Sequence, residues 1–240
     1  MIKDGRTKGI TSPKDRSGLK DAWINFSEEQ LNALETEAIF EAQRKYLIKT
    51  VSSPLEWFNS SFLFKMHHEM LSAVWNWAGK VRTSEKNIGV KAYLISSQLE
   101  ELCKDVAYWN TEPVDYTFLE QACWIHYRLA FIHPFEDGNG RFSRLVADRY
   151  LKAHGCSHAI WPEQLHKECD ARSKYIAALE MADAGDLESL ITFTQAMGAK
   201  DPTMEEFTNK PLYQKRFQGN RFLTMQKALL RRQSALLMSL

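Results

Sequence analysis

Twelve consecutive residues, 133–144, bring together the side-chain types that phosphate chemistry uses; they read HPFEDGNGRFSR. His133 can accept a proton near neutral pH, and Asp137 offers a hard oxygen ligand of the kind that Mg²⁺ takes beside a phosphate. Two glycines around an asparagine let backbone N–H groups turn inward around an anion. Arginine forks fit phosphate oxygens better than a point charge does. The pattern predicts a phosphate site with a base beside it.

Apolar residues at helical spacing lie on both sides of this segment, which indicates a loop between two helices. The helices are expected over residues 115–132 and 139–153. The start of the second helix would add unpaired N–H donors and the positive end of the helix dipole. Arg141 and Arg144 would share one face of that helix, because they are three residues apart.

The residue types alone leave plainer readings open. A histidine at a helix end is often a capping or core residue, Asp-Gly and Asn-Gly are ordinary turn dipeptides, and an exposed arginine is usually only solvated. Residues 133–144 also resemble, without a gap, the signature H-P-F-x-[D/E]-G-N-G-R-x-x-R of the Fic family of nucleotidyl transferases. Nine fixed positions are satisfied together, so the resemblance is specific and favours the phosphate site.

Two further stretches resemble the same family. Residues 77–90, which read WAGKVRTSEKNIGV, look like the segment that carries the family's target-docking flap. The flap itself would be formed by Lys86, Asn87, Ile88, Gly89 and Val90. Residues 175–186 look like the closing helices of the family. The resemblance covers roughly residues 20–198 and is nearest the branch called mobile mystery protein B.

A mainly α fold is expected. Ser27 opens a helix with a capping box, and helical spacing recurs over residues 62–75, 98–109, 170–182 and 187–197. The two adjacent histidines in the first of these ranges do not match the H-E-x-x-H zinc motif. Both are therefore expected at the helix surface or at the edge of the core.

Residues 81–95 break the helical pattern. Asn87 and Gly89 stand between apolar positions, which is typical of a small β-hairpin with an exposed edge. The resemblance identifies this hairpin as the flap that lays the target chain across the site. The fold class it implies is a Fic-type helical bundle with one small β-hairpin flap before the active-site helices.

Three regions are expected along the chain. Residues 1–19 form an N-terminal arm that is loose or docked on the surface, and residues 20–198 form the Fic domain. Residues 199–240 form a basic helical extension, because 201–240 carry seven Lys or Arg against three Asp or Glu. This extension would dock on the core, bind a protein partner or a second copy, or touch nucleic acid or a membrane surface.

The bulk composition is that of a soluble globular protein. The chain has 240 residues, 44% of them hydrophobic and 25% charged, with a formal net charge of +1. That charge gives no general reason to expect a nucleic-acid or membrane partner. The N-terminus lacks the apolar core of a signal peptide and no apolar run reaches the length of a membrane span, so a cytoplasmic location is expected.

The resemblance implies transfer of AMP from ATP to a Ser, Thr or Tyr hydroxyl of a target protein. His133 would take the hydroxyl proton, and Asp137 would hold Mg²⁺ as the cofactor. Phosphates would be bound by the remaining loop residues, partly through backbone N–H groups and an amide side chain; these residues are Gly138, Asn139, Gly140, Arg141 and Arg144. Tyr175 would border the adenine. Phe135 is expected to anchor the loop in the core.

Alternatives to AMP transfer stay open. Some relatives use a UMP or phosphocholine donor, and a degenerate Fic fold would bind a nucleotide or a partner without catalysis. Gly140 stands where the target-phosphorylating branch has Lys, which favours nucleotidyl transfer. The family's restraining motif needs a glutamate followed by Gly or Asn, and the chain has none. Restraint would then come from a separate inhibitory protein, as in toxin–antitoxin pairs, or be absent.

Overall fold

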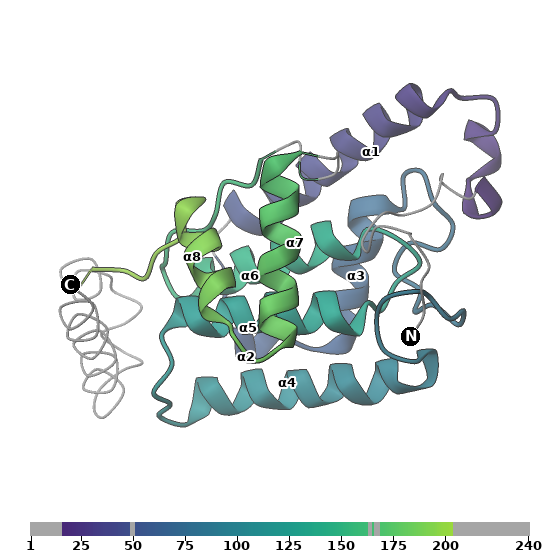
Figure 1. Ribbon diagram of the computed structural model, residues 1–240. Helices are drawn as coiled ribbons and strands as arrows, with labels where there is room; N and C mark the ends of the chain where they lie inside the picture. The colour runs from purple at the N-terminus through teal and green to yellow at the C-terminus, as the bar shows by residue number, and fades with distance from the viewer. Residues whose placement is uncertain (1–15, 49–50, 163–164, 166–168, 204–240) are drawn as a thin grey trace, which may run out of the picture. The chain divides into compact units, whose positions relative to one another are not determined.

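The expectation of a mainly α fold is confirmed by the computed structural model, which describes residues 16–48, 51–162, 165 and 169–203. Within these residues every regular element is helical, and no β-strand is formed. The α-helices, labelled in Figure 1, are α1 (Glu28–Gln43), α2 (Pro54–Trp57), α3 (Ser60–Leu71), α4 (Ile95–Thr111), α5 (Phe118–Ile132), α6 (Asn139–Ala153), α7 (Asp170–Asp183) and α8 (Glu188–Ala196).

The chain divides into two compact units. The first comprises residues 1–50, 58–103 and 126–146, and the second comprises 51–57, 104–125 and 147–240. Helices α4, α5 and α6 therefore each contribute residues to both units. The predicted phosphate loop, residues 133–144, belongs wholly to the first unit.

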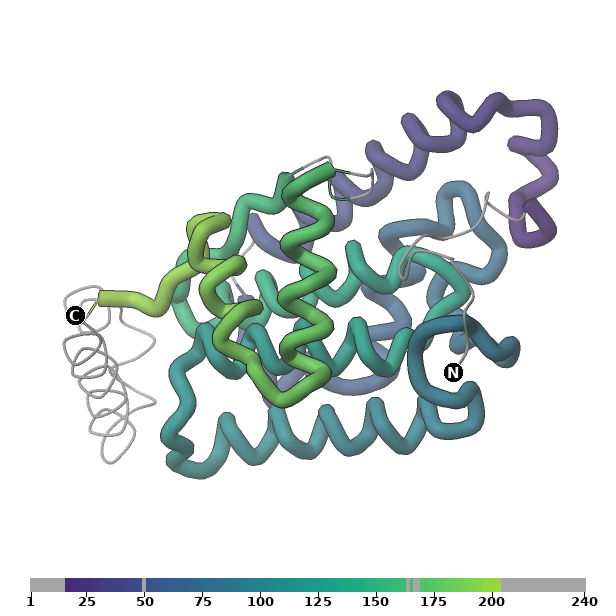
Figure 2. Tube along the Cα trace, in the orientation of Figure 1, coloured from purple at the N-terminus to yellow at the C-terminus, as the bar shows by residue number. Residues whose placement is uncertain are grey.

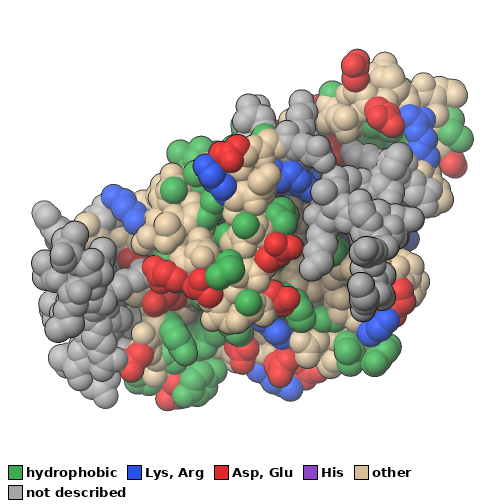
Figure 3. Space-filling model, in the orientation of Figure 1, with side chains coloured by type: hydrophobic (Ala, Val, Ile, Leu, Met, Phe, Trp, Pro, Cys, Tyr) green, Lys and Arg blue, Asp and Glu red, His purple; other side chains and the backbone are tan. Residues whose placement is uncertain are grey.

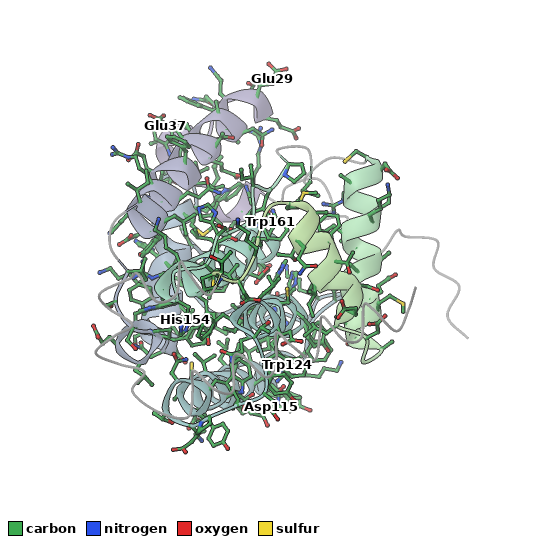
Figure 4. The ribbon with its side chains drawn as sticks, turned by 90° about the vertical axis from the view of Figure 1, so that its left-hand side faces the viewer. Glu29, Glu37, Asp115, Trp124, His154 and Trp161 are labelled. Atoms are coloured by element: carbon green, nitrogen blue, oxygen red, sulfur yellow. The ribbon has the colours of Figure 1, made fainter. Side chains whose placement is uncertain are left out.

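In the first unit, α1 packs against α3, as the purple and blue segments of Figure 2 show. The predicted capping box is confirmed: Ser27 Oγ accepts from the Gln30 N–H at 3.3 Å, and Gln30 Oε1 accepts from the Ser27 N–H at 2.8 Å. Charged residues of α1 such as Glu29 and Glu37 are exposed (Figure 4). The core face of α3 is fully buried and consists of Leu63, Met66, His67, Met70 and Leu71.

In the second unit, α7 and α8 lie side by side (Figures 1 and 2). Gly185, at φ 97°, turns the chain between them. Asp148 on α6 holds the segment that precedes α7, because its carboxylate accepts from Trp161 Nε1 at 2.7 Å and from the Ala159 N–H at 3.3 Å. Trp161 and His154 of this unit are labelled in Figure 4.

The described helices are all too short or too polar to cross a membrane. On the face of the molecule shown in Figure 3, acidic and basic side chains are interspersed.

The β-hairpin predicted over residues 81–95 is wrong. Val81 forms only an isolated bridge with Phe135, residues 82–91 form a loop, and Ala92–Leu94 form a 3₁₀ turn. The physical reason lies in the hydrogen bonds of this loop. The carbonyls of Ser84 and Val90, on either side of the expected turn, both accept from the side chain of Arg82 instead of pairing across a ladder.

The two chain ends are only partly covered by the structure. Residues 1–15 of the predicted arm lie outside the described residues, but Arg16–Gly18 form a 3₁₀ turn and Leu19 forms a bridge with Trp75. The described end of the arm is thus docked on the first unit. Residues 204–240, which hold almost all of the predicted basic extension, lie outside the described residues.

Candidate active site

The loop between α5 and α6 is anchored by one aromatic side chain. Phe135 is fully buried, and its ring stacks on the ring of His67 with centroids 3.6 Å apart. The ring of Phe142 meets it edge-on at 5.0 Å. The expectation that Phe135 anchors the loop in the core is confirmed. His67 itself is fully buried, so the prediction that it lies at the surface or core edge is wrong.

Burial separates the loop residues into two groups. The buried group is Pro134, Phe135, Gly138, Asn139, Phe142 and Ser143. The partly exposed group is His133, Glu136, Asp137, Gly140, Arg141 and Arg144. Most residues that the sequence singles out for chemistry are therefore in contact with solvent. The buried group fixes the loop to the core.

The ring of His133 is oriented by a backbone carbonyl. Its Nδ1 lies 3.4 Å from the carbonyl oxygen of Ala130, which can only accept a hydrogen bond. Nδ1 therefore carries the proton of the neutral ring, and Nε2 presents a lone pair. Burial lowers the pKa of His133 to about 4; Arg82 and Lys86 also lower it, against opposing effects of Ala130 and Asp137. The ring is neutral at pH 7, as a general base requires.

The N-terminus of α6 follows directly. The Gly138 carbonyl accepts from the Phe142 N–H at 2.9 Å, so the N–H groups of Asn139, Gly140 and Arg141 form the first helical turn and lack intrahelical acceptors. Gly138 has φ 78°, a left-handed conformation suited to glycine. These N–H groups and the helix dipole favour an anion at this point.

The side chain of Asn139 is used inside the loop. Its Oδ1 accepts from the Phe135 N–H and its Nδ2 donates to the Phe135 carbonyl, both at 2.9 Å. The sequence-based expectation gave this amide to the phosphates. The structure instead shows both of its polar ends closing the turn, and the backbone N–H of Asn139 lies in the first turn of α6.

The two adjacent carboxylates of the loop have different partners. Glu136 accepts from Ser84 Oγ at 3.3 Å and pairs with the ammonium of Lys86. Asp137 Oδ1 accepts from the Gly138 N–H at 2.6 Å. Among the described residues no partner is recorded for Asp137 Oδ2. One partly exposed carboxylate beside an anion site suits Mg²⁺, which protein sites often bind through one or two carboxylates plus substrate phosphates and water.

Arg141 is paired with a buried carboxylate. Arg141 Nη1 lies 2.9 Å from Glu35 Oε2 on α1, and Glu35 Oε1 accepts from Trp75 Nε1 at 2.6 Å. Glu35 is buried, at 3% exposure. Sequence reasoning missed this carboxylate. A signal existed, because Glu35 is four residues from Leu31 and so lies on the apolar face of α1.

The predicted flap residues lie against the candidate base. Gly89 has φ 93°, and a Cβ built on it would be 2.5 Å from Cβ of His133. Lys86 reaches the loop through Glu136, and Ile88 is 37% exposed. The first unit therefore brings the flap (Lys86, Asn87, Ile88, Gly89, Val90) to the same place as His133 and the start of α6.

Tyr175 belongs to the second unit. It lies on α7, is 3% exposed, and packs against the rings of Trp161 and Phe193 at centroid distances of 6.3 and 5.8 Å. Its assignment to the adenine stays a prediction.

Comparison with known proteins agrees with the resemblance noted in the loop. Residues 57–151 match the model of the Fic/DOC family. The chain is 30% identical over 118 residues to the protein adenylyltransferase fic-1 of Caenorhabditis elegans, an alignment covering 48% of this chain and 22% of that protein. It is 41% identical over 84 residues to the protein adenylyltransferase Fic of Drosophila persimilis, covering 35% of this chain and 14% of that protein.

Solved structures agree on the fold. The BepC protein of Bartonella tribocorum with bound AMPPNP has a TM-score of 0.59 at 16% sequence identity, and the alignment covers 82% of this chain and 96% of that one. The chain spans less than a quarter of the length of the two curated relatives above. The match to the family model, residues 57–151, includes both the loop and the flap.

Proposed function

Because residues 57–151 match the model of the Fic/DOC family, we propose that the protein transfers AMP from ATP to a Ser, Thr or Tyr hydroxyl of a target protein. One observation carries the proposal. A ring with Nδ1 committed to the Ala130 carbonyl, and hence with a free lone pair on Nε2, stands on the same short loop as the N-terminus of α6. Both the acceptor for a hydroxyl proton and the holder of a triphosphate are therefore in one place.

The proposed reaction balances as a single displacement. The target hydroxyl oxygen forms a bond to the α-phosphorus of ATP while the bond from that phosphorus to the oxygen bridging to the β-phosphate breaks. Pyrophosphate leaves with the electron pair of the broken bond. His133 Nε2 takes the hydroxyl proton as the oxygen attacks. Its neutral state at pH 7 follows from the lowered pKa.

The triphosphate is held by the start of α6. The backbone N–H groups of Asn139, Gly140 and Arg141 offer the donors, because the Gly138 N–H is bonded to Asp137 Oδ1. The left-handed turn at Gly138 leads into this helical start, and the positive end of the helix dipole adds to the donors. The guanidinium groups of Arg141 and Arg144 neutralise negative charge on the triphosphate. Arg141 is held by Glu35 through Nη1 alone, so its other nitrogens remain for phosphate oxygens. Tyr175 is proposed to border the adenine.

Asp137 would hold Mg²⁺, supported by its exposed position beside this anion site. When bound, the ion neutralises charge on the phosphates and on the departing pyrophosphate. The Asp137–Gly138 hydrogen bond fixes one carboxylate oxygen, which leaves the other oriented toward solvent or a ligand.

The flap is proposed to hold the target protein. Lys86, Asn87, Ile88, Gly89 and Val90 form an irregular loop that would present main-chain groups to an extended segment of the target. Because Gly89 has no side chain, the target backbone and the ring of His133 can approach the same point. A separate inhibitory protein is proposed to restrain the enzyme; the alternative is that the enzyme has no such restraint.

The test is incubation with Mg²⁺ and α-labelled ATP in a cell lysate, comparing the parent with His133→Ala. The parent should label at least one protein, and mass spectrometry should find AMP on a hydroxyl side chain. His133→Ala should keep the fold and ATP binding but lose labelling. Arg128→Lys serves as a control because that side chain bonds Gln98 and Glu101 on α4.

Two results would contradict the proposal. Equal labelling by parent and His133→Ala would remove the assigned base. Labelling from α-labelled UTP or a phosphocholine donor, with none from ATP, would keep the transferase and replace the donor.

A further inference from the structure

The backbone of His133 is in a strained conformation. Its φ is 52°, and it is the one residue other than glycine with positive φ among the described residues. A left-handed conformation costs a residue with a Cβ about 1–2 kcal/mol. Such conformations persist only where the surroundings enforce them, and they cluster at functional sites. The neighbours of His133 must therefore include the group that enforces it.

Arg82 is bonded to the backbone at this point. It is 3% exposed, and its Nε donates to the carbonyl of His133 at 2.7 Å. The backbone N–H of Arg82 donates to the carbonyl of Pro134 at 2.9 Å. Two consecutive carbonyls at the strained point are thus held by one residue, which fixes the direction of the peptide planes on either side.

The same guanidinium also holds the flap. Arg82 Nη1 donates to the Ser84 carbonyl at 2.7 Å, and Nη2 donates to the Val90 carbonyl at 2.5 Å. Ser84 precedes the flap and Val90 is its last residue, and the flap has no strand ladder of its own. The three acceptors surround a planar fork, so the distance from the flap to His133 is set by the size of one side chain.

We propose that Arg82 is a positioning residue for the transfer reaction: its guanidinium holds His133 in the left-handed conformation and fixes the flap to the same point. The inference rests on the proposed function in naming the reaction. Arg82 touches neither reactant; it acts through the backbone of His133, and through the flap that receives the target.

The direct test compares Arg82→Lys with the parent and with the control Arg128→Lys. A lysine keeps the charge but is a single ammonium, so it cannot serve three carbonyls held apart by a planar fork. Arg82→Lys is expected to lower kcat for transfer about 10- to 100-fold, because misplacement of a catalytic group by about 1 Å costs that much. KM for ATP should stay within about twofold, since the phosphate donors belong to α6. Arg128→Lys should change neither.

A spectroscopic readout separates positioning from a general loss of stability. In the parent, ¹⁵N shifts of the His133 ring should show a protonated Nδ1 and an unprotonated Nε2. In Arg82→Lys the ring loses its fixed relation to the Ala130 carbonyl, and the shifts should indicate mixed tautomers. Unchanged shifts together with an unchanged kcat would overturn the proposal. This readout needs no transfer activity, so it still tests Arg82 if the parent proves inactive and the proposed function fails.

A measurement on the parent alone covers the case in which Arg82 variants do not fold. The Nε–H of Arg82 is buried and bonded to the His133 carbonyl, so it should exchange with solvent far more slowly than the Nε–H of Arg44, whose side chain is 60% exposed. Exchange of Arg82 at the rate of Arg44 would overturn the proposal.

Discussion

His67 connects α3 to the phosphate loop through both of its ring nitrogens. Nε2 lies 3.0 Å from the Asp137 carbonyl, and Nδ1 accepts from the Gly79 N–H at 2.9 Å. Because a carbonyl cannot donate, the proton of the neutral ring must be on Nε2. If Nδ1 were also protonated, its N–H would face the Gly79 N–H, and the two donors could not form a hydrogen bond. Burial lowers the pKa of His67 to about 3, in agreement with a ring that stays neutral.

Replacing His67 with Leu should destabilise the protein strongly. The Asp137 carbonyl and the Gly79 N–H, both bonded to the buried ring, would each lose a partner, at about 1–3 kcal/mol apiece. We expect the free energy of unfolding to fall by about 2–5 kcal/mol in urea titrations. His67→Gln keeps a donor and an acceptor and should lose less; equal losses in the two variants would show that shape, and not hydrogen bonding, matters at this position.

The rate of transfer should persist below the ordinary pKa of histidine. Burial lowers the pKa of His133 from 6.5 to about 4 in the free protein, and the negative charge of a bound triphosphate raises it again. The acid limb of the rate at saturating ATP should therefore be centred between these two values. Initial rates across pH at constant ionic strength, with the fold checked by circular dichroism, measure it. A limb centred above 6.5 would contradict the assignment of His133.

At the scale of elements, the flap meets the candidate base at Gly89. Gly89→Ala adds a methyl group 2.5 Å from Cβ of His133, at a φ of 93°. We expect transfer to fall at least about tenfold, because either the base or the flap must move. Gly185→Ala is a matched control, since Gly185 has φ 97° and nothing within 4 Å of the added carbon.

Both glycine variants should lose about 1–2 kcal/mol of stability from backbone strain alone. Only Gly89→Ala should lose more transfer activity than its loss of folded protein explains. Equal activity in the two variants would mean that the contact between flap and base does not matter for transfer.

Local signals in the sequence account for the helices and most of the loop. Helix α6 runs over the predicted range 139–153, because the glycines that end the loop and the apolar spacing after them are both local. Helix α5 starts at Phe118 and not at 115, since Thr117 and Glu120 form a capping box that the periodicity did not reveal.

The errors arise where partners are distant in sequence. The flap was predicted as a hairpin because its turn residues are those of one. The carbonyls beside that turn are instead satisfied by Arg82, a side chain whose direction no pattern of apolar residues encodes. The prediction of His67 at the surface or core edge fails for the same reason: its two partners, Asp137 and Gly79, come close only in the folded chain.

At the scale of the whole molecule, buried histidines should make the fold sensitive to acid. Burial lowers the pKa of His67 and of His126 to about 3, with Arg144 also lowering that of His126. Above the unfolded value of 6.5 neither state binds these protons, so stability is complete. Below it the unfolded chain binds protons that the folded chain excludes, and stability falls until the pH reaches the folded pKa.

The free energy of unfolding should therefore decrease between pH 7 and pH 5, by about 2 kcal/mol for each of these two histidines. Urea titrations at several pH values measure the slope. His126→Leu removes one of the titrating groups. In this variant the free energy of unfolding should therefore change less steeply with pH, by at most about 1.4 kcal/mol per pH unit. An identical slope in parent and variant would show that His126 does not titrate as proposed.

The ion pair between Arg141 and Glu35 reaches outside the stretch by which the family is recognised. A recombinant fragment cut to residues 57–151 would contain the entire motif and yet lack α1, leaving the guanidinium without its buried counter-charge. Anyone transplanting this motif into another scaffold would have to bring the amino-terminal helix along with it.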